Sequence, residues 1–148
     1  MPLLNYTTKI AADKTAAEIE RTLVKHGARA ILRSYTEDRE INALLFRVLT
    51  PHGEMAIRLP IDADATLKVL GRQYQGRQIS RSFVTREQAV RIAWRIVKDW
   101  VEAQMAILET EMVKMEQIFL PYMVTPEGKT LYEAMEEKRF YLNQGQTD

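Results

Sequence analysis

Positively charged side chains concentrate in the middle of this sequence. Residues 65–98 contain eight Lys or Arg and one Glu, a net charge of +7, whereas residues 1–64 balance nine bases with nine acids. A run of cations with so little acid beside it suits a phosphate backbone, because every neutralised phosphate releases counterions. The sequence therefore predicts one continuous basic strip made of Lys68, Arg72, Arg77, Arg81, Arg86, Arg91, Arg95 and Lys98.

Aromatic residues stand at both ends of the loop that we expect within this strip. In YQGRQISRSF, Tyr74 and Phe83 flank Arg77 and Arg81. An aromatic ring can stack on an unpaired base, and each such contact stabilises a complex by roughly 1–3 kcal/mol. We therefore expect a mobile loop that grips a single-stranded nucleic acid.

The strands expected before residue 60 supply further cations to the predicted site. One strand carries Arg29, Arg33 and Tyr35, and its neighbours carry Arg47 and Arg58. A sheet face that combines arginines with an aromatic ring is a plausible platform for single strands.

Other interpretations of the same residues stay open. Arg91, Arg95 and Lys98 could be the solvated stripe of a buried helix, paired with the acids that follow or with the C-terminal helices, and Phe83 could be a core residue. A basic strip can also meet an acidic protein surface, such as residues 99–148 with four bases and ten acids. The sequence thus favours a non-enzymatic protein that binds single-stranded nucleic acid. The alternative is an adaptor or inhibitor that binds a host protein through an oligomeric helical surface.

Residues that could catalyse a reaction or bind a metal form no recognisable motif. His26 and His52 lack a partner at a ligand spacing, and there is no cysteine. Asp62 and Asp64 could hold Mg²⁺ with His52 or Glu54, but the start of a helix explains both aspartates better. We expect no enzymatic activity, no cofactor and no metal.

The expected fold is α+β, in the order β-α-β-β-β followed by helices. A sheet of three to four antiparallel strands is predicted at Asn5–Ile10, Ala28–Tyr35, Glu40–Leu49 and Glu54–Leu59. The helix between the first two strands should open with a capping box of Thr15 and Glu18 and stop at Gly27.

Four helices are expected after Pro60. Asp62 should cap a short helix over Ala63–Arg72, and Thr85 with Gln88 should open a long one that reaches about Met112. Pro121 should break the following helix, and the last one should span about Thr130–Tyr141. Because the long helix is apolar around most of its circumference, we expect Trp94 and Trp100 to be largely buried and a homo-oligomer to form through this helix.

Length and composition predict one domain over residues 1–148. Residues 1–60 should form the sheet with one helix, 61–141 the helical part and 142–148 a frayed tail. No apolar run is long enough for a signal peptide or a membrane span, so we expect a cytoplasmic protein with no membrane partner.

Several sequence segments spread over most of the chain are typical of one group of proteins. They are NYTTKI, AAEIERTLVKHGARAIL, FRVLTPHGEMAIRLP, AWRIVKDWVEAQMAILE, IFLPYMV and GKTLYEAM. Together they resemble a family of small uncharacterised proteins of phages and integrated mobile elements, which implies a role in phage or mobile-element DNA metabolism or in countering host defence. The order of sheet and long helices is also similar in architecture to single-strand-binding proteins of the Whirly and PC4 type, although those begin with strands alone.

Overall fold

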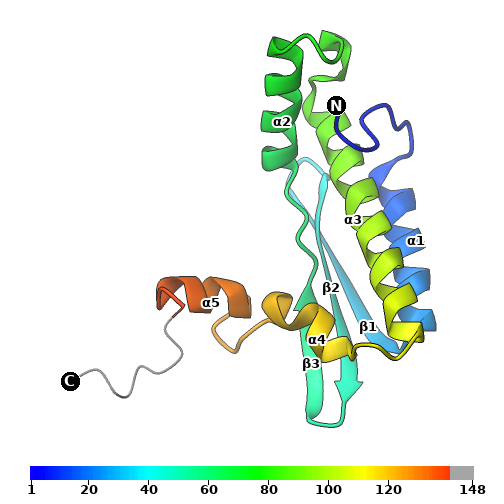
Figure 1. Ribbon diagram of the computed structural model, residues 1–148, viewed down its shortest axis with the longest axis vertical. Helices are drawn as coiled ribbons and strands as arrows, with labels where there is room; N and C mark the ends of the chain where they lie inside the picture. The colour runs from blue at the N-terminus through cyan, green and yellow to red at the C-terminus, as the bar shows by residue number, and fades with distance from the viewer. Residues whose placement is uncertain (141–148) are drawn as a thin grey trace.

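Three antiparallel strands form the sheet in this α+β chain, of which the computed structural model describes residues 1–140 (Figure 1). The strands are β1 (Ala28–Tyr35), β2 (Ile41–Thr50) and β3 (Gly53–Arg58), with β2 in the centre. Phe46 on β2 pairs with Ile31 on one side and with Ile57 on the other, which places these three side chains on the same face. The predicted three-stranded meander is confirmed.

Five helices and two short 3₁₀ turns make up most of the rest of residues 1–140. They are α1 (Ala12–Lys25), α2 (Ala63–Gln75), η1 (Arg81–Phe83), α3 (Arg86–Glu109), α4 (Met115–Phe119), η2 (Leu120–Tyr122) and α5 (Leu131–Glu137). The predicted caps of α2 and α3 are present, because Asp62 Oδ1 accepts from the Ala65 amide and Thr85 Oγ1 accepts from the Gln88 amide. Glu111, with φ +63°, turns the chain after α3, which therefore ends before Met112.

The prediction that Asn5–Ile10 adds a fourth strand is wrong. Asn5 has φ +64°, and the segment forms turns that lie against α3. The Gln88 amide nitrogen donates to the carbonyls of Tyr6 and Thr8, at 2.8 and 2.9 Å. These bonds occupy backbone groups that a strand would need for its neighbour.

The predicted capping box at the start of α1 is also wrong. The helix begins at Ala12 after an Ala11 cap, so Thr15 lies inside it and is fully buried. The Thr15 hydroxyl lies 3.4 Å from the Ala11 carbonyl and accepts from Arg95 of α3 at the same distance. The end of the helix matches the prediction, because Gly27 follows it with φ +105°, a conformation that favours glycine.

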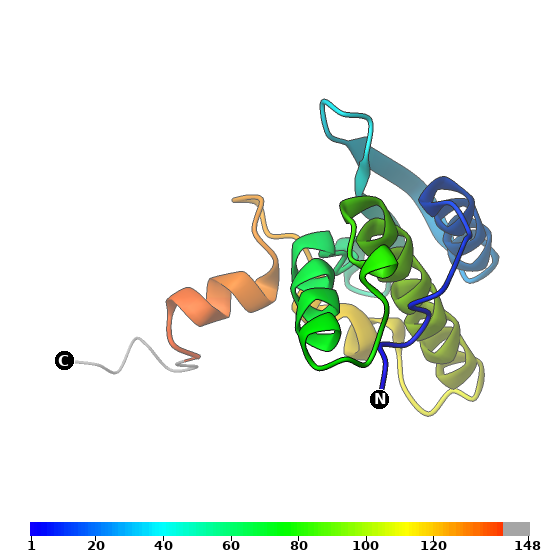
Figure 2. The ribbon, with the colours of Figure 1, turned by 90° about the horizontal axis from the view of Figure 1, so that it is seen from above.

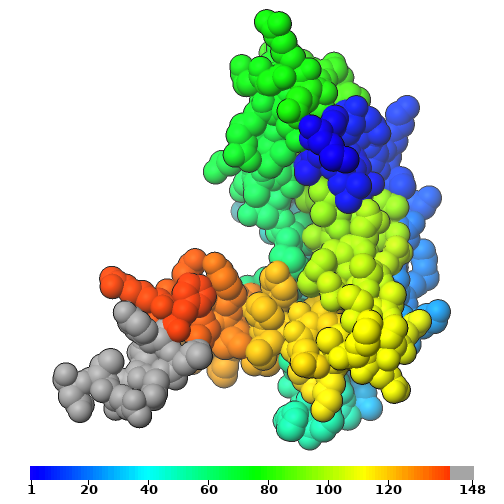
Figure 3. All heavy atoms as spheres, viewed as in Figure 1, coloured from blue at the N-terminus to red at the C-terminus, as the bar shows by residue number. Residues whose placement is uncertain are grey.

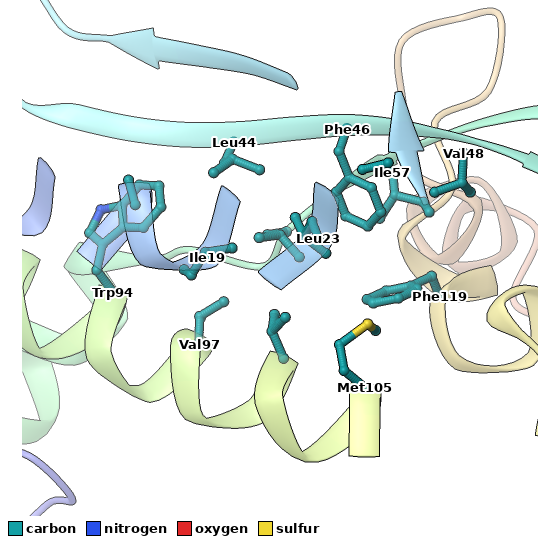
Figure 4. Close-up of a cluster of buried hydrophobic side chains, with 14 of the residues drawn as sticks. Ile19, Leu23, Leu44, Phe46, Val48, Ile57, Trp94, Val97, Met105 and Phe119 are labelled. Atoms are coloured by element: carbon teal, nitrogen blue, oxygen red, sulfur yellow. The ribbon is translucent and has the colours of Figure 1, made fainter. Parts of the chain in front are cut away.

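The main core lies between the sheet, α1, α3 and α4 (Figure 4). Trp94 is 0% exposed, and its indole nitrogen donates to the Ile41 carbonyl at 3.2 Å. Trp100 is half-buried and packs edge-on against Phe119 and Tyr122, with ring centroids 5.7 and 5.6 Å apart. The predicted burial is therefore confirmed for Trp94 and holds in part for Trp100.

A smaller core holds α2 against the first half of α3, beyond the end of the sheet (Figure 1). Its buried members are Leu70, Ile79, Ala89 and Ile92, and Leu3, Tyr6, Leu67, Phe83, Val84 and Ile96 pack around them. The apolar faces of α3 thus meet α1, the sheet and α2 within one chain. Oligomerisation through the long helix stays a prediction.

The last described part of the chain forms an arm that extends sideways from the body (Figures 1 and 2). Pro121 ends α4 as predicted, and the Val124 amide then donates to the Ala56 carbonyl at 2.8 Å beside β3. Thr130 and Glu133 cap each other at the start of α5, which ends at Glu137. The tail predicted over residues 142–148 lies outside the described residues. Within residues 1–140, none of the helices has the length and hydropathy that crossing a bilayer requires.

Candidate functional site

The cations of the predicted strip separate into two groups, and the group on α3 is paired within the chain. Arg91 Nη1 lies 2.7 Å from Glu87 Oε1, Arg95 Nη1 lies 2.6 Å from Glu18 Oε2, and Lys98 Nζ lies 2.6 Å from Glu102 Oε1. Each contact supplies the negative charge that a phosphate would otherwise provide. The interpretation that these cations are paired within the chain is therefore correct, but the expected partner is right only for Lys98, since Arg91 pairs with the preceding Glu87 and Arg95 with Glu18 of α1.

Arg86, at the start of α3, joins two other elements. Its guanidinium donates to both carboxylate oxygens of Glu40, at 2.9 and 2.8 Å, and also to Asp64 at the start of α2. The bonds from Arg86 hold the pKa of Glu40 below its ordinary value of 4.5. The same bonds raise the pKa of Arg86. This network fixes the start of α3 to the turn before β2.

Three of the cations predicted on the sheet are also engaged within the chain, whereas Arg29 is exposed and has no ion-pair partner among residues 1–140. Arg33 Nε donates to Glu20 of α1 at 2.5 Å, and this bond raises the pKa of Arg33. Arg47 Nη1 lies 3.4 Å from Glu54, and Arg58 donates to the Gly128 carbonyl at 3.1 Å. The Tyr35 hydroxyl donates to Asp13 of α1, and Glu133 lies 3.8 Å from Arg58.

Four cations remain on and after α2. Lys68, Arg72, Arg77 and Arg81 are exposed, and none of them has an ion-pair partner among residues 1–140. Lys68 and Arg72 are one turn apart on one face of α2, where they border a shallow groove of about 730 Å³. We name these four residues the α2 basic patch. Figure 3 shows the α2 lobe standing clear of the arm.

Small residues lie beside these cations. Gly71 adjoins Lys68 and Arg72 in the groove, and a Cβ at Gly71 would meet nothing within 4 Å. Ala65 lies on the same face of α2. With little side-chain bulk in the way, an extended ligand chain can come close to the helix while its charges reach the two cations.

Arg77 occupies the position that ends α2. Its amide donates to the Tyr74 carbonyl at 2.9 Å, and the Gln78 amide donates to the Gln73 carbonyl at 2.8 Å. These two bonds make a Schellman motif in which the residue with positive φ is usually glycine. Here that residue is Arg77, with φ +59°, while Gly76 stands one position earlier with φ −79°. A cation therefore holds a place where glycine would be less strained.

The two aromatic residues predicted to stack on bases do not share one surface with the groove. Tyr74 follows Arg72 by two residues, which is about 200° around the helix, so the two point to different sides. It is nevertheless 39% exposed. Phe83 is half-buried in the smaller core and packs edge-on against Tyr6, with ring centroids 5.1 Å apart. Phe83 is thus a core residue, and Tyr74 is the aromatic ring that stays accessible beside the patch.

Two glutamine side chains hold the N-terminal segment against α2 and α3. Gln73 Oε1 accepts from the Leu3 amide at 3.0 Å, which ties the N-terminal segment to α2. Gln88 is 5% exposed, donates to Tyr6 and Thr8, and accepts from the Arg91 guanidinium at 2.7 Å. The sequence predicted a capping box of Thr85 and Gln88. Only half of it forms, because the Gln88 amide donates to Thr85 Oγ1 while the Gln88 side chain bonds elsewhere.

The residues weighed for catalysis or metal binding have other partners or positions. His26 contacts the Thr22 carbonyl at 2.8 Å and Glu109 at 3.0 Å, whereas His52 is exposed in the turn before β3. Asp62 caps α2, and Asp64 pairs with Arg86. No three His, Asp or Glu side chains within the described part of the chain are grouped so as to hold a metal ion.

Comparison of the chain with models of protein families, with curated proteins and with solved structures finds no match in any of the three.

Proposed function

We propose that this chain binds single-stranded nucleic acid, with DNA favoured over RNA, through the α2 basic patch. The observation that carries the proposal is the contrast within the basic segment. Its cations on α3 are paired with carboxylates, whereas Lys68, Arg72, Arg77 and Arg81 are exposed and unpaired within residues 1–140. Cations held close together without a counterion attract a polyanion and gain free energy from the counterions that it releases.

The size and shape of the patch favour one strand over a duplex. Four cations match a few successive phosphates, and a flexible strand can follow α2 and then turn around the helix end at Arg77. Tyr74, on another side of the same helix end, can accept a base in stacking contact once the strand has turned. A non-enzymatic role accords with this mode of binding. The setting in a phage or mobile element and the host-protein alternative stay predictions from the sequence.

The test is fluorescence anisotropy with labelled single-stranded DNA, single-stranded RNA and duplex DNA over a series of salt concentrations. Since each phosphate contact to a single strand contributes about −0.7 to the slope of log K against log salt, four contacts predict a slope of about −3. The variant Lys68→Ala/Arg72→Ala/Arg81→Ala should bring the slope to about −1 and weaken binding at low salt at least about tenfold.

The matched control removes cations that are paired. Arg47→Ala/Arg91→Ala/Lys98→Ala also loses three positive charges, but each has a carboxylate partner in the structure. If bare net charge decided binding, both triple variants would weaken it equally. Equal losses, or no binding by the wild type at low salt, would refute the proposal, and circular dichroism checks that both variants are folded.

A further inference from the structure

β1 is an edge strand whose outer side is free. Within residues 1–140 the backbone of β1 forms hydrogen bonds only with β2, and residues 30–34 pair with β2 in continuous register. In an antiparallel pair, every second residue directs its amide and carbonyl away from the neighbouring strand. β1 therefore presents a row of unpaired backbone groups, to which another extended segment can add as a further strand.

Two grooves border this edge, one on each face of the sheet. Towards α1, which lies beside β1 (Figure 1), there is a groove of about 670 Å³, which we name the α1–β1 groove. On the opposite face, which we name the outer face, there is a groove of about 380 Å³. Ala30 and Ile31 line both grooves, so an added strand would have one of them on each side of its backbone.

The side of the edge that faces α1 is cationic. Arg21, Lys25 and Arg29 line the α1–β1 groove, are exposed, and have no ion-pair partner in the described part of the chain. The one carboxylate in the lining, Glu20, already accepts from Arg33 at 2.5 Å. Three cations without a counter-charge attract carboxylates. The side chains that an added strand directs towards α1 should therefore be acidic.

The other side of the edge is apolar. Leu32 follows Ile31 and so points to the outer face, where it is 60% exposed. Leu45 of β2 lies directly across from Leu32. The cation on this face, Arg47, already lies 3.4 Å from Glu54. The side chains that an added strand directs to the outer face should therefore be aliphatic, because they would cover an exposed leucine.

We propose that β1 binds, by strand addition, an extended segment of another protein in which acidic side chains alternate with aliphatic ones. Successive side chains of a strand point to opposite faces, so this alternation sends every carboxylate towards Arg21, Lys25 and Arg29 and every aliphatic group towards Leu32. A second copy of β1 does not fit, because its sequence ARAILRSY contains two arginines and no acid. A phosphate backbone could meet the cations, but it offers neither amides and carbonyls for the strand edge nor an apolar group for Leu32.

The test is fluorescence anisotropy with a labelled peptide in which glutamate and valine alternate over eight residues, the length of β1. The wild type should bind this peptide. A peptide of the same composition, with its glutamates and valines in separate blocks, should bind at least about tenfold more weakly, because it cannot send each kind of side chain to its own face.

Methylation of backbone amides distinguishes strand addition from attraction between charges alone. One peptide is methylated at the amides of its valines and another at those of its glutamates. Only one of these two sets faces β1 in an added strand, so one peptide should lose affinity at least about tenfold and the other should retain it.

The protein variants locate the site. The groove variant Arg21→Glu/Lys25→Glu should weaken peptide binding at least about tenfold, and the milder Arg21→Gln/Lys25→Gln should weaken it in the same direction. The matched control Lys68→Glu/Arg72→Glu makes the same change of charge on α2 and should keep the peptide affinity within about twofold. Circular dichroism checks that each variant is folded. Because the groove variant keeps the whole α2 basic patch, it should bind single-stranded DNA like the wild type, which separates this inference from the proposed function.

Four results would overturn the inference. They are a wild type that does not bind the alternating peptide, equal affinity for the alternating and block peptides, two methylated peptides that both bind like the parent, and equal losses in the groove variant and the α2 control. A groove variant that binds the peptide normally but loses single-stranded DNA would assign the α1–β1 groove to nucleic acid instead.

Discussion

Arg95 and Glu18 join α3 to α1 through a contact of 2.6 Å between Nη1 and Oε2, with only 15% and 23% of their side chains exposed. Arg95 Nη1 also lies 3.4 Å from the buried Thr15 hydroxyl. An arginine in the middle of a basic stripe is here part of the packing between two helices. Its charge is satisfied inside the fold, which sets Arg95 apart from Arg72.

We predict that Arg95→Ala lowers the free energy of unfolding by about 1–3 kcal/mol, since it leaves the Glu18 carboxylate partly buried without its cation. Affinity for a single-stranded oligonucleotide at low salt should stay within about twofold of the wild type. Urea unfolding and anisotropy measure the two effects. The double variant Glu18→Gln/Arg95→Met removes both charges and should be less destabilised than Arg95→Ala. A stable Arg95→Ala protein that has lost oligonucleotide binding would contradict this prediction.

Substitution of Arg77 should have the opposite pair of effects, a more stable fold and weaker binding of nucleic acid. Arg77→Gly should raise the free energy of unfolding by about 0.5–1 kcal/mol, because glycine adopts the φ of +59° without the strain of a side chain. The same substitution removes one cation of the α2 basic patch, so the salt slope for a single strand should become shallower by about 0.7. Thermal or urea unfolding, combined with anisotropy, would show a more stable protein that binds more weakly.

The control for this prediction is Arg77→Ala, which loses the same charge but keeps a Cβ at positive φ. It should weaken binding as Arg77→Gly does, without the gain in stability. If Arg77→Gly is less stable than Arg77→Ala, the side chain of Arg77 contributes to folding in a way that the helix-end geometry does not account for.

Local signals in the sequence predicted the elements well, because they act over a few residues. Asp62 and Thr85 cap the helices that they were expected to cap, and β1 has the predicted bounds. The sequence could not predict which charged side chains pair, since Glu18 and Arg95 are 77 positions apart and meet only after α1 packs on α3. The prediction of a strand at Asn5–Ile10 was wrong for a related reason. Its β-forming composition is genuine, but a distant glutamine takes the carbonyls that a neighbouring strand would have used.

Gln88 provides a test of how the N-terminal segment is held. Gln88→Ala removes two partly buried hydrogen bonds to the Tyr6 and Thr8 carbonyls and should lower the free energy of unfolding by about 1–3 kcal/mol. Hydrogen exchange should accelerate most in residues 1–10, before it does so in β1–β3. Gln88→Glu keeps the shape but cannot donate to Tyr6 and Thr8, so it should be at least as destabilised. Unchanged exchange in residues 1–10 of either variant would show that the smaller core alone fixes this segment.

The Glu40–Arg86 contact predicts a stability that depends on pH. Because Arg86 holds the pKa of Glu40 below 4.5, the ionised form is favoured in the folded chain. The contribution of Glu40 is therefore fully present above the ordinary pKa and is lost as the pH falls through the lowered one. The wild type should exceed Glu40→Gln in unfolding free energy at neutral pH, and the two should converge in acid.

The pKa of Glu133 is also lowered, by its bonds from Thr130, so acid unfolding of the wild type alone cannot isolate Glu40. Glu133→Gln supplies the control, because the difference between wild type and Glu40→Gln should persist in that background. A difference that stays constant with pH would mean that Glu40 stabilises the fold through its shape rather than its charge.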